Sequence, residues 1–384
     1  MELSKLRKFI SPEVVTGENS RFLLTKYIRN LGMKNPMIVT DSGIIEAGWV
    51  QEILNLLNSQ GVVYELFYEI LPNPRDFQVE AGAKRFASAR CDSLIAIGGG
   101  SVIDCAKGIG IVFSNKQPIY TFEGVDKVKA PMPPLVCIPT TSGSSADVSQ
   151  FAIINHVEAK TKFAIISSSL IPDVSLIDPV VLQTMSSFLT ACTAIDAMTH
   201  AFEAYVSLSS SEITDLHALE SIRLIHENLP LLIENQSSIH HWNNLMIGSY
   251  FAGVAFSNAS LGCTHSLAHS LGGYLDLPHG ECNALLLPYV VDFNFFYAAS
   301  KYRKIATILG LHCNISDNRL KDELVNYLIQ FSRNLGITDT LKLKGITTNV
   351  IPILASKSIL DPCNATNPRI PSQTDLETIY KEAL

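Results

Sequence analysis

The sequence has little of what marks membrane-embedded, secreted or nucleic-acid-binding proteins. Charged residues make up 17% of the 384 residues, the formal net charge is −7, and no concentrated basic stretch offers a face for phosphates. No run approaches the roughly 18 apolar residues that a membrane helix requires, and the N-terminal stretch MELSKLRKFISPEV lacks the apolar core of a signal peptide. We therefore expect a cytoplasmic protein with no nucleic-acid or membrane partner.

Cysteine pairs are also missing. The eight cysteines are spread widely and form no CxxC pair, which argues against a disulfide framework and against a zinc ribbon in a chain of this length. Most of them lie in apolar stretches, so we expect reduced thiols in the core, as in a cytoplasmic protein.

The chain changes its pattern near its middle. Up to about residue 180, short apolar runs such as PMIVTD (36–41), VVYELFY (62–68), SLIAIGGG (93–100) and PLVCIP (134–139) alternate with helical patterns. This alternation predicts βαβ units and a parallel sheet. From about residue 186, helical patterns dominate, over 187–207, 212–234, 240–257, 260–274, 298–309 and 319–335. We expect an α/β domain over 1–185 and an all-helical domain over 186–384, with a site in the cleft between them.

A glycine run follows one predicted strand directly. Gly98, Gly99 and Gly100 come after the strand, and Ser101 is the predicted N-cap of the next helix. Glycines permit a close approach of the backbone to a ligand, and a helix start offers free N–H groups to a phosphate. The run is not the GxGxxG dinucleotide fingerprint. A tight strand-to-helix turn without a ligand explains the triplet alone about equally well.

Two further loops favour a nucleotide. Asp41 ends the strand PMIVTD, where a carboxylate would accept hydrogen bonds from an adenosine ribose and repel a 2′-phosphate, favouring NAD over NADP. The loop PTTSGSSAD (139–147) also follows a strand and offers many hydroxyl donors. Taken singly, an aspartate such as Asp41 is more commonly a solvated turn residue, and the hydroxyl-rich loop could be a flexible surface loop. Three such loops at successive strand ends predict a nucleotide site.

Histidines and one aspartate gather in the helical half. Asp196 and His200 are four residues apart in AIDAMTHAFEAY, His265 and His269 are four apart in CTHSLAHSLGG, and His279 is predicted to lie in a loop at the turn DLPHG. One such i,i+4 pair is usually an ordinary structural contact. Together, in apolar surroundings, these groups need partners, because unpaired buried polar groups cost about 1–3 kcal/mol each. A divalent metal satisfies all of them, and the donor types suit Zn²⁺ and Fe²⁺ alike.

These stretches together resemble the iron-containing (group III) alcohol dehydrogenases, nearly end to end. The resemblance is carried by PNP (72–74), IGGGSVIDCAK (97–107), IPTTSGSSAD (138–147), LIPDVSLIDP (170–179), AIDAMTHAFEAYVS (194–207), CTHSLAHSLGG (263–273), PHGECNALLLP (278–288) and NPR (367–369). It implies a dehydroquinate-synthase-like architecture, in which an α/β nucleotide-binding domain precedes an all-helical metal-binding domain, and a homodimer or larger homo-oligomer.

The resemblance also implies a role for particular residues. It assigns the metal to Asp196, His200, His265 and His279, and it places His269 near the nicotinamide and the substrate as the catalytic residue. The cofactor contacts that it implies are Asp41, Asn73, Gly98, Gly99, Gly100, Ser101, Asp104, Thr140, Thr141, Ser144 and Lys162. One loop departs from the family pattern P-T-T-x-G-T-G-S-E: Ser145 replaces a glycine, Ala146 a serine and Asp147 a glutamate.

The implied reaction is the NAD-linked interconversion of a primary alcohol and its aldehyde, with the substrate oxygen polarised by a divalent metal. Four protein ligands leave room for substrate on Fe²⁺, whereas four-ligand Zn²⁺ sites are usually closed, so we expect iron. Phe151, Phe256 and Leu261 could line the alcohol pocket, although core packing is the commoner use of such residues. Two alternatives stay open: a dehydroquinate-synthase- or glycerol-phosphate-dehydrogenase-like enzyme, disfavoured by the few basic residues near the motifs, and a non-catalytic NAD- and metal-binding regulator.

Overall fold

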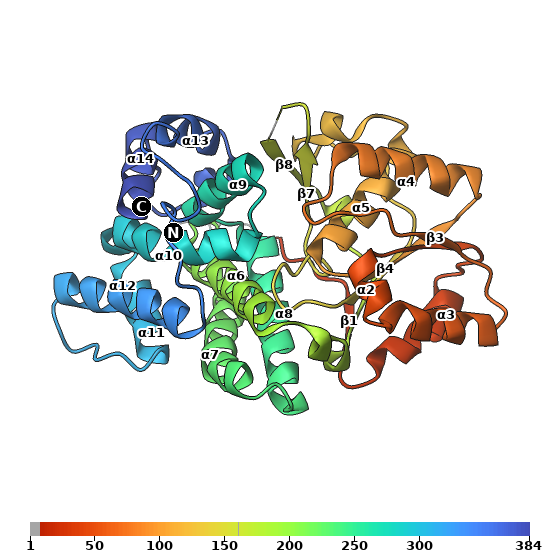
Figure 1. The fold of residues 1–384 in the computed structure, drawn as a ribbon, viewed down its shortest axis with the longest axis horizontal. Coiled ribbons are helices and arrows are strands. Elements are labelled where there is room, and N and C mark those ends of the chain that lie inside the picture. The colour runs from red at the N-terminus through yellow and green to blue at the C-terminus, as the bar shows by residue number, and fades with distance from the viewer. Residues whose placement is uncertain (1–7, 160) are drawn as a thin grey trace, which may run out of the picture.

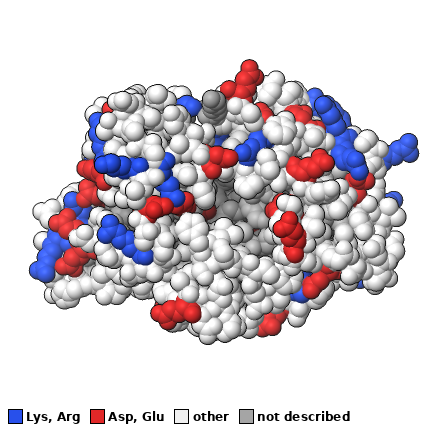
Figure 2. All heavy atoms as spheres, in the orientation of Figure 1, with Lys and Arg blue, Asp and Glu red and all other residues white. Residues whose placement is uncertain are grey.

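The computed structural model describes residues 8–159 and 161–384. An α/β part formed by the first half of the chain lies beside a helical part formed by the second half (Figure 1). The space-filling view shows the molecule hollowed between the two parts (Figure 2). Residues 1–7, which begin the N-terminal stretch without a signal-peptide core, lie outside the described chain.

A six-stranded parallel sheet forms the centre of the α/β part. Its strands, in spatial order, are β1 (Glu13–Thr16), β9 (Val174–Ile177), β6 (Leu135–Pro139), β4 (Ser93–Gly98), β2 (Pro36–Val39) and β3 (Glu65–Phe67). The expected parallel sheet is therefore confirmed, and the predicted strand over 62–68 is three residues long. Alternate residues of the central strands enter two separate apolar clusters, so both faces are covered, as in other parallel sheets.

Helices cover both faces of this sheet. They are α1 (Leu24–Asn30), α2 (Ser42–Glu46), α3 (Trp49–Ser59), α4 (Asp76–Ser88) and α5 (Gly100–Asn115). The continuous helical pattern after Asp41 is divided into α2 and α3 at Gly48, whose φ of 88° ends the first helix. Short 3-10 turns complete this part: η1 (Ser20–Leu23), η2 (Ile119–Phe122), η3 (Ser168–Leu170) and η4 (Pro179–Thr184).

A second, smaller sheet was not expected from the alternating pattern. It contains β5 (Gly124–Val125), β8 (Thr161–Ile166) and β7 (Phe151–His156), with β7 and β8 antiparallel. Its three strands are short, and β8 packs against a helix of the second half, α9. Tertiary packing, more than local alternation, therefore stabilises this sheet.

The second half is helical, as expected. Its helices are α6 (Ser187–Val206), α7 (Glu212–Glu234), α8 (Ile239–Ala259), α9 (Cys263–Leu275), α10 (His279–Asn294), α11 (Ala299–Ile308), α12 (Asp317–Asn334), α13 (Ile351–Ser358) and α14 (Gln373–Glu382), with η5 (Phe295–Tyr297) and η6 (Pro362–Thr366). Between the two parts, η4 ends at Thr184 and α6 begins at Ser187. The domain boundary at 185/186 stays a prediction. In the described part of the chain, every helix is too short or too polar to cross a membrane.

A buried ion pair connects η1, near the N-terminus, to the residue that follows strand β9. Arg21 in η1 donates from Nη1 to Oδ2 of Asp178 at 2.6 Å, and Asp178 is fully buried directly after β9. Arg21 also bonds to Glu52 in α3 at 2.9 Å, but that carboxylate is 43% exposed. The two pairs share one guanidinium and differ in burial.

We predict that Arg21→Met lowers the free energy of unfolding by about 3–5 kcal/mol, because it leaves the Asp178 carboxylate buried without its counter-charge. Glu52→Gln serves as the matched control and should cost less than about 1 kcal/mol, since its pair is solvated. Urea unfolding of the three proteins measures both effects. Equal losses in the two variants would contradict the assigned difference in burial.

Candidate metal and cofactor site

Three imidazoles converge on one carboxylate oxygen in the helical part. The Nε2 atoms of His265 and His279 lie 3.7 Å from Oδ1 of Asp196, and Nε2 of His200 lies 3.9 Å from it. Asp196 and His200 occupy one face of α6, His265 the first turn of α9, and His279 the first position of α10. The structure thus brings together all four residues that the sequence predicts as metal ligands, although their role stays a prediction.

The distances from the three imidazoles to Asp196 fit a first-row cation, and Asp196, His265 and His279 offer ligand atoms that all lie within 4.8 Å of one another. Two ligand atoms each about 2.1 Å from a metal at a tetrahedral angle lie about 3.4 Å apart, and wider angles separate them further. Distances of 3.7–3.9 Å agree with this range. Asp196, His200 and His265 are at most 4% exposed. One buried carboxylate and three imidazole nitrogens form a set of ligand atoms that such a cation accepts.

His279 was predicted to lie in a loop, and that prediction is wrong. It is the first residue of α10, with Pro278 as the N-cap residue. The helix was missed because Pro288 interrupts its pattern from inside. A Cβ on Gly280 would lie 2.1 Å from the carbonyl oxygen of Cys192, so the glycine allows α10 to start directly against α6.

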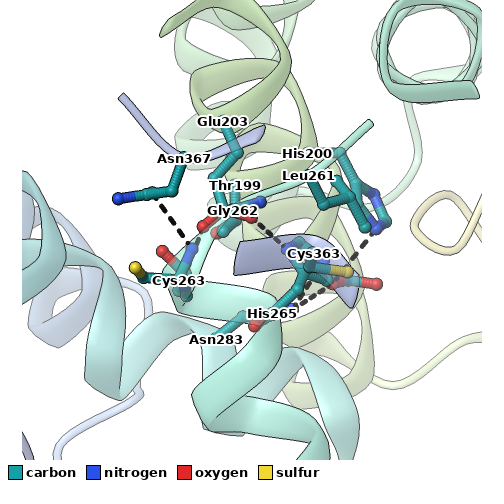
Figure 3. A network of polar contacts seen from close by, with 12 residues as sticks. Thr199, His200, Glu203, Leu261, Gly262, Cys263, His265, Asn283, Cys363 and Asn367 are labelled. Atoms are coloured by element: carbon teal, nitrogen blue, oxygen red, sulfur yellow. Dashed lines mark hydrogen bonds and ion pairs between the residues drawn. The ribbon is translucent and has the colours of Figure 1, made fainter. Parts of the chain in front are cut away.

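Two polar side chains that the sequence analysis did not single out complete this cluster (Figure 3). Asn283 Nδ2 donates to Asp196 Oδ1 at 2.6 Å and lies 3.2 Å from Nε2 of both His265 and His279. Glu203 lies one turn beyond His200 on α6 and accepts from His265 Nδ1 at 2.6 Å. The seven-residue spacing of Asp196 and Glu203 was a signal in the sequence, because it places both on one helix face.

Burial and charge act in opposite directions on these groups. Burial would raise the pKa of Asp196, but the surrounding His200 and His279 hold it well below its usual range. Burial would lower the pKa of His265, whereas Glu203 and Asp196 raise it to about 9. For His200 burial prevails and lowers the pKa to about 4. Asp196 is therefore an ionised carboxylate, and the imidazoles around it have pKa values shifted in opposite directions.

The core around the cluster contains the three apolar residues considered for an alcohol pocket. Phe151, Phe256 and Leu261 are each at most 6% exposed and belong to the main apolar cluster of the helical part. The ring of Phe256 stacks on His200 with a centroid separation of 4.3 Å. Core packing is therefore the observed use of these residues.

The glycine run and Asp41 lie at adjacent strand ends. The chain passes from β2 to β3 on one side and then to β4 on the other side of β2, so β2 and β4 flank the switch point of the sheet. Ligands of doubly wound sheets bind outside the carboxyl ends of the strands at such a point. Asp41 follows β2 and accepts from Ile44 N at 3.0 Å as the N-cap of α2.

The glycine run packs against the hydroxyl-rich loop after β6. A Cβ on Gly100 would lie 2.6 Å from Ser144, and one on Gly99 would lie 3.1 Å from Thr141. The backbone N–H of Thr140 donates to Gly98 O at 3.1 Å. The three predicted loops are thus brought together, and only glycine permits this approach.

Ser101 was predicted as the N-cap of α5, and that prediction is wrong. Gly99 occupies the N-cap position, and no side chain caps it. Ser101 lies within the first turn, and its Oγ accepts from Asn73 N at 3.1 Å. The helix begins earlier because Gly100 is already its first residue, and the N-cap Gly99 has no side chain to accept from the N-terminal N–H groups.

Two further predicted cofactor residues form a bridge to the helical part. Lys162 Nζ donates to Asn73 Oδ1 at 2.7 Å, and Asn73 Nδ2 donates to Asp276 Oδ1 at 2.8 Å at the end of α9. Asp104 faces inward instead: it is 9% exposed and accepts from Ile153 N at 3.1 Å, and burial raises its pKa to about 6. The cofactor contacts of all three residues stay predictions.

His269 borders a cavity of about 400 Å³ between β8, α9 and the turn from α13 to η6. Its Nδ1 lies 2.8 Å from Oδ2 of Asp361, which lines the same cavity together with Lys162. The ring of His269 stacks on His279 at 5.3 Å, so it lies beside the four donors without being one of them. Asp361 was not predicted; its only signal is its place shortly before the NPR motif.

Fold and site together define a class of protein: a two-part chain in which a parallel-sheet α/β part precedes a helical part, with a candidate metal site beside the cleft between them. Comparison with known proteins gives the family. Residues 11–179 match the model of the iron-containing alcohol dehydrogenases, and residues 190–384 match the C-terminal model of the same family. The chain belongs to the iron-containing alcohol dehydrogenase family, and it is an NAD-linked alcohol oxidoreductase.

Individual relatives agree with this assignment. The chain is 34% identical to the 1,3-propanediol dehydrogenase of Klebsiella pneumoniae over 370 residues, covering 96% of both chains. It is 36% identical to alcohol dehydrogenase 4 of Saccharomyces cerevisiae strain YJM789 over 375 residues, covering 98% of this chain and 97% of the relative. A crystal structure of a 1,3-propanediol oxidoreductase superposes with a TM-score of 0.95 at 32% identity, covering 99% of this chain and 100% of that one.

The loop that departs from the family pattern is accommodated by its own contacts. Ser145 has a φ of 49°, in the left-handed region, and its Oγ donates to Ser249 O at 2.7 Å. Asp147 is 5% exposed, and its Oδ2 accepts from Ser175 Oγ at 2.6 Å in β9. The shorter acid therefore bonds to the sheet, and the serine anchors the loop to α8.

We predict that Ser145→Ala lowers the free energy of unfolding by about 1 kcal/mol more than Ser145→Gly does. Both variants lose the hydrogen bond to Ser249, but only glycine adopts a positive φ without steric cost. Thermal and urea unfolding of the two variants measure the difference. An alanine variant at least as stable as the glycine variant would show that the left-handed backbone carries no cost here.

Proposed function

We propose that this enzyme interconverts a primary alcohol and its aldehyde with NAD(H), using Fe²⁺ held by Asp196, His200, His265 and His279. The observation that carries the proposal is the convergence of three Nε2 atoms on one buried carboxylate oxygen at 3.7–3.9 Å. A divalent cation there would supply Lewis-acid polarisation of the substrate oxygen. Iron is favoured over zinc because four protein ligands close most zinc sites.

His269 is proposed to pass the alcohol proton towards solvent. Its Nδ1 faces the Asp361 carboxylate at 2.8 Å, an arrangement that holds the ring in one orientation and leaves Nε2 free to exchange a proton. The adjoining cavity of about 400 Å³ provides a route for water to reach the ring. A proton acceptor must lie within hydrogen-bond reach of the alcohol or be joined to it by one water. The stacking of His269 on His279 supports a position of His269 beside the metal-bound substrate.

The cofactor is proposed to lie across the switch point of the sheet. The loop of Gly98, Gly99 and Gly100 would receive the pyrophosphate at the start of α5, with Ser101, Thr140, Thr141 and Ser144 around it. Asp41 would bind the adenosine ribose, and Asn73 and Lys162 would lie nearer the nicotinamide end. The bond between Lys162 and Asn73 at 2.7 Å supports a shared task for these two residues.

We also propose a homodimer or larger homo-oligomer in the cytoplasm. The family resemblance supports the assembly, and eight cysteines without a disulfide among the described residues support a reducing compartment. Light scattering of the purified protein tests the oligomeric state.

We predict NADH oxidation with short aldehydes when the protein is prepared anaerobically with Fe²⁺. The panel should include lactaldehyde and, in the reverse direction, 1,3-propanediol, which are the compounds in the names of two relatives, together with a polyol phosphate. His265→Ala and chelator treatment should each lower kcat/KM at least about 100-fold, because each removes electrophilic stabilisation worth several kcal/mol.

His240→Ala is the matched control, since this histidine is exposed and far from the donors in sequence, and it should retain activity. Turnover of the polyol phosphate alone would favour the glycerol-phosphate-dehydrogenase-like alternative. Tight NADH and metal binding without any turnover would favour the regulatory alternative.

We predict that Asp41→Asn raises kcat/KM with NADPH about 10-fold relative to that with NADH. Asparagine retains the N-cap of α2 and removes the charge that repels a 2′-phosphate, and one unit of charge at partly solvated range is worth about 1 kcal/mol or more. Glu46→Gln, at the exposed end of the same helix, should leave the ratio unchanged. An unchanged ratio in Asp41→Asn would remove Asp41 from the ribose site.

A further inference from the structure

Glu203 is a buried carboxylate to which neither the family resemblance nor the metal-ligand set assigns a role. It is 4% exposed on α6 and accepts three hydrogen bonds (Figure 3). Its Oε2 accepts from Gly262 N at 3.0 Å and from His265 Nδ1 at 2.6 Å, and its Oε1 accepts from Thr264 N at 2.6 Å. All three donors belong to the start of α9.

The first function of this carboxylate is to cap a helix that has no cap of its own. Gly262 is the N-cap residue of α9 and offers no side chain, so the free N–H groups at the helix start need an acceptor from elsewhere. Glu203 supplies it from α6, and Asn367 contributes a second acceptor, because its Oδ1 receives a hydrogen bond from Cys263 N at 3.1 Å. Two acceptors from outside α9 therefore stabilise one helix terminus.

Of these two acceptors, Glu203 and Asn367, it is Glu203 that also accepts from His265, one of the candidate metal ligands. Backbone N–H groups donate to both oxygens of Glu203, so the carboxyl group is an acceptor at each of them and Nδ1 of His265 carries the hydrogen in their contact. With the hydrogen on Nδ1, Nε2 is the nitrogen that points toward the oxygen of Asp196, 3.7 Å away, and it is the one that can give up its hydrogen and bind a cation. The contact with Glu203 thus holds the ring orientation and the hydrogen on Nδ1.

We propose that Glu203 is a positioning residue for the metal, which holds His265 in the Nδ1–H tautomer with Nε2 directed at the cation. The inference rests on the proposed metal function of Asp196, His200, His265 and His279. Carboxylates that accept from the far nitrogen of a metal-bound histidine fix its orientation and raise its basicity, and their loss typically weakens metal binding 10- to 100-fold.

Glu203→Gln tests the proposal with little change of shape. A carboxamide has one oxygen and one NH₂ group, and only the oxygen accepts hydrogen bonds. It therefore cannot serve Thr264 N, Gly262 N and His265 Nδ1 all at once. When its oxygen takes the position of Oε1, its NH₂ faces His265, which must turn to the other tautomer and carry its hydrogen on Nε2. When its oxygen takes the position of Oε2, His265 Nδ1 keeps its acceptor but loses the carboxylate charge that raises its basicity. We expect the dissociation constant for Zn²⁺, measured by chelator competition, to rise about 10- to 100-fold.

Asn367→Ala is the matched control, because it weakens the same helix terminus without touching His265. We expect its Zn²⁺ affinity to stay within about threefold of wild type, with a lower melting temperature. A double-mutant cycle adds a second criterion: in a His265→Ala background, Glu203→Gln should have no further effect on Zn²⁺ affinity. An equal loss of affinity in Asn367→Ala, or an additive loss in the cycle, would reduce Glu203 to a helix cap and overturn the proposal.

One measurement requires no variant at position 203 to fold. In Zn²⁺-loaded wild type labelled with ¹⁵N-histidine, we expect a slowly exchanging Nδ1–H proton far downfield that disappears in His265→Ala. Absence of that signal in wild type overturns the proposal. Wild type that binds no Zn²⁺, Co²⁺ or Fe²⁺ would instead refute the proposed metal function, whereas normal binding in Glu203→Gln refutes this inference alone.

Discussion

The structure of the helical part depends on the burial of the Asp196 carboxylate among imidazoles. A carboxylate removed from water is strongly unfavourable unless charges and donors surround it. Here the surrounding imidazoles come from three helices, α6, α9 and α10, which must therefore meet at one point. The contact between Gly280 and the backbone of Cys192 is a direct consequence, since a larger residue would hold α10 away from the carboxylate.

The same requirement extends into the α/β part. The loop after β6 lies against the start of α6, because a Cβ on Gly143 would lie 2.6 Å from the carbonyl oxygen of Thr193. Thr193 precedes Asp196 by less than one turn. The hydroxyl-rich loop that approaches the glycine run thus also contacts the helix that carries the carboxylate. The candidate cofactor site and the candidate metal site are joined by backbone contacts, with few flexible side chains between them.

Sequence patterns were most informative where a period repeats over many residues. The parallel sheet and the long helices α6 and α7 follow from such patterns, and α7 has the predicted limits of 212 and 234. The metal donors were recognisable because histidine and aspartate are rare in apolar stretches. Tertiary contacts decided the rest: the hairpin of β7 and β8 packs on α9, α10 contains a proline, and α9 takes its cap from Glu203. Asp361 could not be predicted, since a partner 92 residues away in the sequence leaves no local pattern. Asn283 lies one helical turn after His279, but the helix that brings the two together was itself missed because it contains Pro288.

Helix α9 carries two histidines four residues apart, and each ring is held by a carboxylate from a different element. His265 is bound to Glu203 of α6, and His269 is bound to Asp361 before η6. Rotation of α9 about its axis would break both bonds at once, so the helix has to move together with its two partners as one rigid body. The two histidines of α9 would therefore keep their geometry toward α6 and the turn before η6 whenever the helix moves.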